Sequence, residues 1–248
     1  MRFVSIASLL FSLAPLAMAQ STAHWSYEGK TGPFAWSRLD PSYAACAKGH
    51  EQAPIAIRGT HLNKALAPVE FHYISGGVKI ENNGHTIQVT VHPGSYILVD
   101  GTRYDLVQFH FHHPGEEAIK GTPADMDVHL VHRSADGKLA VIAVRFNQDH
   151  DIANALMATL WPHLPATVGK SEELTDLINP GGFLPASRSY WTYTGSLSTP
   201  PCTEGVRWFI YQDEVPISRA QFRAFASLYR FNARQLQDAH GRRIEASE

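Results

Sequence analysis

Three histidines are spaced so that their imidazoles could hold one metal ion. His110 and His112 lie two residues apart in a segment from Tyr104 to His113 that alternates apolar and polar residues, and His129 lies in the later segment Asp-Val-His-Leu-Val-His. Such alternation is typical of a β-strand, in which side chains two residues apart share one face. If the two segments are neighbouring strands, the three imidazoles converge. Three nitrogen ligands with a fourth position left for water are typical of a catalytic zinc site.

The same alternation places a polar residue beside each end of this histidine group. Gln108 lies two residues before His110, and Asp127 lies two residues before His129, so each shares the strand face of its histidine. A ligand histidine needs an acceptor for its second ring nitrogen, because that bond fixes the tautomer and the orientation of the ring. We therefore expect Gln108 and Asp127 to be these acceptors.

Three classes of protein fit the histidines taken alone: a zinc hydrolase or hydratase, an exported zinc-binding or zinc-storage protein, and a cupin. A cupin is a β-barrel with His-x-His, then Glu and a later histidine, and this chain offers Glu116 and His129 after the first pair. A cupin also has a glycine shortly before the first histidine and a Gly/Pro motif before the last. Here Tyr104 stands six residues before His110, and no such motif precedes His129. The cupin is therefore the weaker alternative.

The elements that must position these residues are mostly strands. A helix is predicted over 152–160, ending before Pro162, and Ser218 with Gln221 forms a capping box at the start of a second helix. The chain before residue 75 is predicted to wrap the domain with little regular structure. We expect one mainly β domain with a few peripheral helices. The predicted strands span 78–81, 85–91, 96–99, 106–113, 127–132, 139–146, 189–194 and 206–212.

Length and charge narrow the class of protein further. The 248 residues are enough for one large domain, and contents of 44% apolar and 18% charged residues are ordinary for a globular protein. A net charge of -2 gives no reason to expect a nucleic acid or an anionic membrane as a partner. The sequence leaves open whether the chain is a monomer or a homodimer.

The first 19 residues are typical of a signal peptide. They contain a basic residue, Arg2, an apolar run and Ala-Met-Ala at the predicted cleavage site, so the mature domain would span 20–248. The protein would then be periplasmic or secreted. In an oxidising compartment the only two cysteines of the chain, Cys46 and Cys202, are expected to form a disulfide.

Further motifs accompany Gln-Phe-His-Phe-His. They are Glu-Asn-Asn-Gly-His at 81–85, Gly-Ser-Leu-Ser-Thr-Pro-Pro-Cys-Thr-Glu-Gly-Val-Arg-Trp at 195–208, and Phe-Asn-Ala-Arg at 231–234. Together they resemble the α-class carbonic anhydrases, and the resemblance runs from Trp25 to Ile244. It implies a central, twisted, mostly antiparallel sheet with Zn2+ at the base of a conical cleft. It also implies the reversible reaction of CO2 and water to bicarbonate and a proton.

The resemblance also implies roles for individual residues. The three histidines would hold zinc, whose hydroxide attacks CO2. Ser198 would orient that hydroxide by accepting a hydrogen bond from it, and would donate a hydrogen bond to Glu116. Thr199 would line the bicarbonate site. His85 would shuttle the released proton, with its waters ordered by Tyr27, Asn83 and Gln88. The apolar wall for CO2 would be Val131, Val141, Leu197, Val206 and Trp208.

Three positions near the metal depart from the family pattern. Asp127 stands where the family usually has Glu, Glu117 where His is common, and Ser198 where Thr is usual. Because Asp is one methylene shorter than Glu, its bond to His129 would be lost or bridged by water. Glu117 places a second acid beside Glu116, and two like charges raise a carboxyl pKa. We therefore expect an active but slower enzyme.

Overall fold

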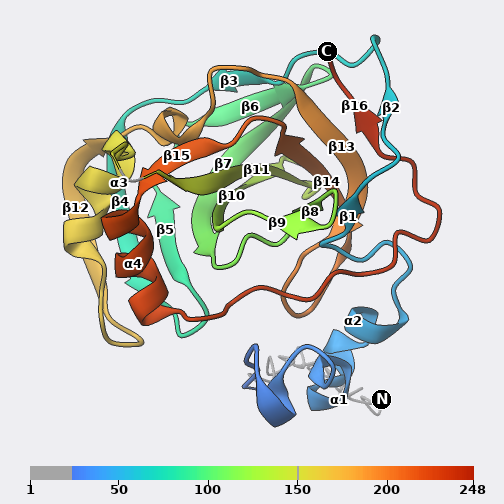
Figure 1. Cartoon of the computed structure of the whole chain (residues 1–248), viewed down its shortest axis with the longest axis horizontal. Helices are drawn as coiled ribbons and strands as arrows, with labels where there is room; N and C mark the ends of the chain where they lie inside the picture. Colours follow the sequence, from blue (N-terminus) through green and yellow to red (C-terminus); the bar gives the residue numbers. More distant parts are fainter. Residues whose placement is uncertain (1–23, 150) are drawn as a thin grey trace, which may run out of the picture.

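The computed structural model describes residues 24–149 and 151–248. The predicted signal peptide lies outside these described residues. Figure 1 shows a broad curved sheet with short helices at its margins. Within the described residues, none of the helices has both the length and the apolar character needed to cross a membrane.

One twisted, mixed sheet of thirteen strands is the main element of the described chain. Its strands are β2 (His61–Leu62), β3 (Glu70–His72), β4 (Gly76–Asn82), β5 (Ile87–Val91), β6 (Tyr96–Val99), β7 (Thr102–His112), β10 (Met126–Ser134), β11 (Leu139–Asp149), β12 (Ser171–Ile178), β13 (Tyr190–Ser196), β14 (Glu204–Tyr211), β15 (Val215–Ser218) and β16 (Glu245–Ala246). The main order is β12-β4-β5-β7-β10-β11-β14-β13-β16-β2, with β15, β6 and β3 attached at its side. Most neighbours are antiparallel; β14 and β15 run parallel to β11, and β2 runs parallel to β16. The prediction of a mainly β, mostly antiparallel domain is confirmed.

The remaining elements are short. A small sheet consists of β1 (Ala56–Ile57), β8 (Ala118–Ile119) and β9 (Thr122–Pro123). The helices are α1 (Trp36–Leu39), α2 (Ala45–Lys48), α3 (Ala155–Leu160) and α4 (Arg219–Leu228), with 3-10 turns η1 (Gly29–Thr31), η2 (Pro41–Tyr43), η3 (Trp161–His163) and η4 (Pro180–Phe183). In Figure 1 α1 and α2 lie together below the sheet, whereas α3 and α4 lie at its left margin.

The alternation along β7 decides which side chains lie on each face of the sheet. Phe109 and Phe111 are fully buried in the larger apolar core. His110 and His112 therefore point to the opposite face, where the smaller core contains Trp208. The sheet thus separates the main core from the histidine group.

Helix boundaries follow the capping residues. At α4 the capping box is present: the Ser218 hydroxyl accepts from Gln221 N at 3.2 Å, and Gln221 Oε1 accepts from Ser218 N at 3.1 Å. At α3 the Asn154 side chain accepts from the Met157 N–H, so the helix begins after Asn154. The helix α3 ends at Leu160, before Pro162, as predicted, but it begins at Ala155 and not at residue 152. Pro162 lies in the first turn of the separate 3-10 turn η3, where no backbone donor is needed.

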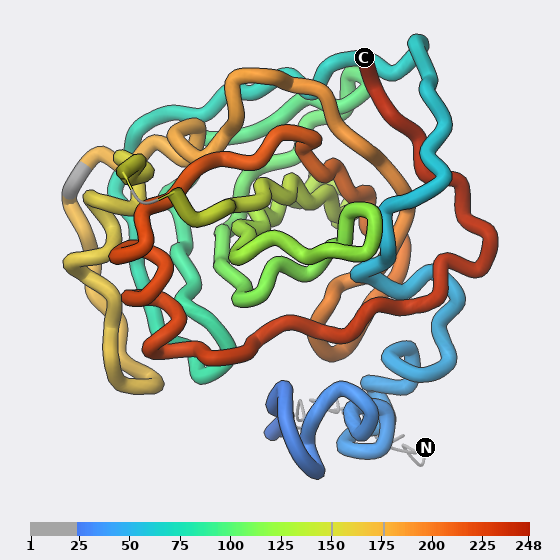
Figure 2. Tube along the Cα trace, in the orientation of Figure 1, coloured from blue at the N-terminus to red at the C-terminus, as the bar shows by residue number. Residues whose placement is uncertain are grey.

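Most strand boundaries differ from the sequence prediction by a few residues; β7, for example, begins at Thr102 and not at residue 106. β5 begins at Ile87, so His85 lies in the turn before the strand and not within it. The strand β12, which pairs only with β4, was not predicted. The chain before residue 75 does wrap the domain, but it includes short helices and strands. Figure 2 shows the red C-terminal segment running beside this blue segment, and Ile55 forms a parallel bridge with Gln237.

Candidate metal centre

The structure brings His110, His112 and His129 together on one face of the sheet. His110 and His129 are directly paired across β7 and β10. Each ring offers one nitrogen, and these nitrogens all lie within 4.8 Å of one another. His112 and His129 are each only 1% exposed, whereas His110 is half-buried. The group is therefore open to a ligand chiefly at His110.

Hydrogen bonds fix two of the three rings. His110 Nδ1 lies 2.8 Å from Gln108 Oε1, and His112 Nδ1 lies 2.7 Å from the carbonyl oxygen of Asn232. Because both partners are acceptors, each Nδ1 carries the proton and each Nε2 has a free lone pair. Burial, followed by the charges of the two other histidines, lowers the pKa of His110 well below its usual value. A neutral imidazole is the form that binds a metal.

The third ring is flanked by carboxylates. His129 Nε2 lies 3.4 Å from Asp127 Oδ2 and 3.8 Å from Glu117 Oε2, so Nδ1, which lies 4.0 Å from Glu116 Oε2, is the nitrogen left for a metal. Burial alone would lower the pKa of His129, but the charges of Asp127 and Glu117 raise it well above its usual value. Asp127 Oδ2 also accepts from the Glu116 N–H at 2.7 Å. Asp127 therefore lies beside His129 without forming a short hydrogen bond to it.

The expected hydrogen bond between Glu116 and Ser198, which lies in the loop after β13, is not formed. Glu116 Oε1 accepts from the Arg234 N–H at 2.8 Å, while its Oε2 is buried without a hydrogen-bond partner. Ser198 is buried, at 5% exposure. Because Oε2 of Glu116 has no partner, the Ser198 hydroxyl does not donate to it in this conformation. Thr199 is half-buried, and its carbonyl accepts from Cys202 N at 2.8 Å. Glu116 Oε2 thus remains able to accept a hydrogen bond.

His85 lies in the turn before β5 and packs against an aromatic ring. Its imidazole stacks on Trp25, with centroids 3.7 Å apart and planes at 5°. Burial, followed by the charge of His24, lowers the pKa of His85 to about 4. The turn is held by Asn83 Oδ1, which accepts from His85 N and Thr86 N, each at 2.9 Å. The Asn83 oxygen is therefore used to form the turn.

The other two predicted water-ordering residues lie near the site. Gln88 is half-buried on β5, directly opposite His110 in the neighbouring strand β7. Burial, and then the charge of Glu116, raise the pKa of Tyr27 well above its usual value. The Tyr27 hydroxyl therefore stays protonated at neutral pH and can donate a hydrogen bond.

The predicted apolar wall lies in the smaller core on the histidine face. Trp208 is 1% exposed, and its ring meets that of His129 edge-on at 4.9 Å between centroids. Its indole N–H donates to Ser196 O at 3.0 Å, which fixes the ring. The cluster contains Val131, Val141, Val206 and Trp208, with Leu197 packed against it.

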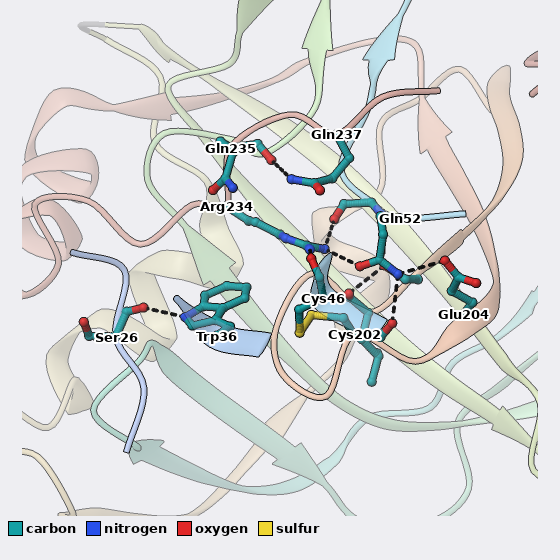
Figure 3. Close-up of a disulfide and its surroundings, with 12 residues drawn as sticks. Ser26, Trp36, Cys46, Gln52, Cys202, Glu204, Arg234, Gln235 and Gln237 are labelled. Carbon is teal, nitrogen blue, oxygen red and sulfur yellow. Dashed lines mark hydrogen bonds between the residues drawn. A yellow bond between two sulfur atoms is a disulfide. The ribbon is translucent and has the colours of Figure 1, made fainter. Parts of the chain in front are cut away.

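Cys46 and Cys202 form a disulfide, as predicted, and it joins α2 to the loop that carries Ser198. Figure 3 shows the Arg234 guanidinium beside this bond. It donates to the Cys46 carbonyl at 2.9 Å and to Gln52 Oε1 at 2.9 Å. Gln52 Nε2 in turn donates to the Cys202 carbonyl at 3.1 Å. The Ser198 loop is thus fixed by both covalent and hydrogen bonds.

Reasoning from the strands missed two contacts made by the segment after α4. The carbonyl of Asn232 holds His112, and the backbone N–H of Arg234 holds Glu116. Asn232 also donates to the carbonyls of His85 and Phe111, at 3.1 Å and 2.9 Å. The only signal in the sequence was the Phe-Asn-Ala-Arg motif.

Comparisons with known proteins agree over nearly the whole chain. The sequence profile described as eukaryotic-type carbonic anhydrase matches residues 31–248. A carbonic anhydrase from Pectobacterium carotovorum is 40% identical over 238 residues, which cover 96% of each chain. One from Nostoc sp. is 34% identical over 247 residues, covering 97% of this chain and 93% of the relative.

A solved structure agrees with these sequence relatives. The α-carbonic anhydrase from Thermovibrio ammonificans, in complex with the inhibitor sulfanilamide, superposes with a TM-score of 0.87. The two are 38% identical, and the match covers 91% of this chain and 100% of the other. These matches exclude the cupin alternative. The chain therefore belongs to the eukaryotic-type, or α-class, carbonic anhydrase family of enzymes.

Proposed function

We propose that the chain hydrates CO2 reversibly to bicarbonate and a proton, using zinc held by His110, His112 and His129. The observation that carries the proposal is the convergence of three imidazoles whose second nitrogens face acceptors. Imidazole nitrogen is a preferred ligand of Zn2+. His112 Nε2 is buried without a hydrogen-bond partner, a state that a bound metal would relieve. Bound zinc would supply a water acidic enough to act as a nucleophile near neutral pH.

The residues around the metal would orient the nucleophile and receive CO2. In the active state the hydroxyl of the buried Ser198 would donate a hydrogen bond to Oε2 of Glu116, which is buried without a partner. The serine oxygen could then accept only from the nucleophile, which directs a lone pair of the nucleophile toward the substrate. Apolar CO2 would lie against the wall that contains Trp208. Bicarbonate would leave past Thr199.

The proton that the reaction releases would leave toward His85. Tyr27 can donate to an intervening water, and Gln88 lies beside His110 on the path. A histidine at this position can accept a proton and pass it to buffer. The stacked ring of His85 would be one state of this carrier, and its rotation away from Trp25 would be another.

The proposal is tested by replacing one ligand. His129→Ala should lose bound zinc and lower kcat/KM for CO2 hydration by at least about 100-fold, because the remaining ligands bind zinc weakly. Zinc content and stopped-flow hydration, with and without sulfanilamide, would measure both effects. His72→Ala, an exposed histidine on β3, is the control and should retain both zinc and activity. Full turnover by His129→Ala would disprove the proposal.

The same measurements separate the enzyme from the remaining alternative. An exported zinc-binding or zinc-storage protein would contain zinc in the wild type but would hydrate CO2 no faster than the buffer does. The enzyme should show zinc together with turnover that sulfanilamide inhibits.

We also propose that the chain is exported after cleavage behind residue 19. The Cys46–Cys202 disulfide supports an oxidising compartment. The intact mass of the protein recovered from the periplasm of an expression host should correspond to a chain that begins at Gln20. A full-length mass in that fraction would contradict cleavage.

A further inference from the structure

A group of buried polar atoms beside His129 has no hydrogen-bond partners. These atoms are both carboxylate oxygens of Glu117, Asp127 Oδ1, the Tyr193 hydroxyl and His129 Nε2. Glu117, Asp127 and His129 are each only 1% exposed, and Tyr193 is 3% exposed. Buried polar groups in folded proteins are almost always paired, because an unpaired group loses its hydration without compensation. Two of these residues, His129 and Tyr193, supply donors, and the carboxylates supply acceptors.

Asp127 is the less suitable acceptor for His129. Its Oδ2 already accepts the Glu116 N–H at 2.7 Å, and the same oxygen lies 3.4 Å from His129 Nε2, beyond ordinary hydrogen-bond length. Its short side chain is therefore committed to the loop that carries Glu116. Glu117 lies 3.8 Å from the same nitrogen and has both oxygens free. A small change in the longer Glu117 side chain would complete the bond.

The second free oxygen of Glu117 has a donor available on the other side. Tyr193 lies on β13, and its ring stacks parallel to Trp208 at 6.3 Å between centroids. Trp208 in turn meets the ring of His129 at 4.9 Å. Burial, and then the charge of Glu117, raise the pKa of Tyr193 well above its usual value. Glu117 thus has two buried oxygens without partners, and His129 and Tyr193 are two buried donors without partners.

We infer that Glu117 is a positioning residue for His129: its carboxylate accepts the His129 Nε2–H and the Tyr193 hydroxyl, and so aims His129 Nδ1 at the metal. This inference rests on the zinc centre proposed above. It also explains why this chain tolerates Asp at position 127. The acceptor of His129 has moved from residue 127, on the same strand, to residue 117, on the preceding loop.

The test measures how fast zinc leaves the protein. Glu117→Gln keeps the side-chain volume but removes the anionic acceptor, so zinc release into excess chelator should accelerate about 10–100-fold. The double variant Glu117→Gln/Asp127→Glu returns a long carboxylate to the strand position and should restore slow release. A residue that only supports packing would lower Tm without changing the release rate, and a carboxylate at position 127 would not compensate for its loss.

A second variant tests the role of the Tyr193 hydroxyl. Tyr193→Phe should accelerate zinc release by less than Glu117→Gln does, and it should add nothing in the Glu117→Gln background, because its hydroxyl acts through Glu117. The matched control is Tyr211→Phe, which removes another buried hydroxyl without a partner, from the larger core. That control should leave the release rate unchanged.

The outcomes distinguish this inference from the proposed function. A wild type that holds no zinc would overturn both. A wild type with zinc and turnover, but with the same release rate in Glu117→Gln, would overturn the inference alone. The inference would also fail if the double variant released zinc as fast as Glu117→Gln. A second zinc equivalent that depends on Glu117 would overturn it as well, because Glu117 would then be a metal ligand.

Discussion

At the scale of single residues, the packing of His85 against Trp25 affects the pKa of His85, the proposed proton carrier. Burial in this position and the nearby charge of His24 lower the pKa of His85 to about 4. A base with so low a pKa binds a proton only briefly near pH 7, whereas transfer is most efficient when the pKa lies near the working pH. Proton release should therefore depend on how often the ring leaves Trp25.

Removing the tryptophan tests this relation. Trp25→Ala should raise the pKa of His85 toward 6.5, because water would reach the ring and stabilise its charged form. An NMR titration of the His85 ring protons measures the change. Trp191→Ala, a half-buried tryptophan near Arg145, is the control and should leave the His85 pKa unchanged. A pKa that stays near 4 in Trp25→Ala would show that the stacking does not set it.

Some contacts at the site could be predicted from the sequence and others could not, and the difference has a physical reason. Gln108 lies on the face of His110 because strand alternation places it there, and the bond is present at 2.8 Å. Asn232 holds His112 through its backbone carbonyl, a group that every residue has, so neither residue type nor spacing marks it. The position of Glu117 came only from the family resemblance. Its closeness to His129 depends on how the loop after β7 folds back.

At the scale of elements, β10 carries one histidine for each face of the sheet. His129 joins the metal group, whereas His132 is buried on the other face, where its Nε2 lies 2.8 Å from the Tyr73 hydroxyl. Burial lowers the pKa of His132 to about 3. In the unfolded chain His132 therefore binds a proton below about pH 6.5, whereas in the folded chain it does so only below about pH 3. The stability contributed by neutral His132 is complete above pH 6.5 and is lost as pH falls through this window.

This linkage predicts the acid sensitivity of the fold. Between pH 7 and pH 5, His132 should reduce the free energy of unfolding by about 2 kcal/mol, calculated from its unfolded and folded pKa values. Urea unfolding of the wild type and of His132→Gln at both pH values isolates the effect, since other titrating groups are common to both proteins. The variant should lose about 2 kcal/mol less than the wild type over this interval. An equal loss in the two proteins would refute the assignment.

Strands with an apolar pattern and clear turn signals could be predicted from the sequence, including the four-residue strand β6, whereas strands without these signals could not. The histidine strands β7 and β10 were located because apolar residues alternate around their histidines, with Phe109 and Phe111 on β7 and Val128 and Leu130 on β10. The strand β12, with the sequence Ser-Glu-Glu-Leu-Thr-Asp-Leu-Ile, is an edge strand that pairs only with β4 and lacks such a series. Two-residue strands such as β1 and β16 exist only through their tertiary partners.

At the scale of the whole molecule, the disulfide connects segments that are far apart in the sequence. Cys46 and Cys202 are separated by 156 residues. Arg234, from the C-terminal segment, donates to the Cys46 carbonyl, so three distant parts of the chain meet at this point (Figure 3). The cross-link encloses both histidine strands and therefore restricts the unfolded chain over most of its length.

Removal of the disulfide should affect the stability of the fold more than it affects catalysis. Cys46→Ser/Cys202→Ser should lower the free energy of unfolding by about 4–5 kcal/mol, as expected for a loop of this length. Guanidinium unfolding of the variant, compared with the oxidised and the reduced wild type, would measure it. The reduced wild type should resemble the variant. A change below about 1 kcal/mol would show that the hydrogen bonds of Arg234 hold this region without the disulfide.

The contacts made by the segment after α4 determine when the histidine group can be completed during biosynthesis. The acceptor for His112 is the Asn232 carbonyl, and the donor that holds Glu116 is the Arg234 amide. A nascent polypeptide that has been synthesised past β10 but not yet to Asn232 has both histidine strands but neither of these supports. A fully shaped histidine group is therefore available only to a polypeptide that has been synthesised beyond Arg234.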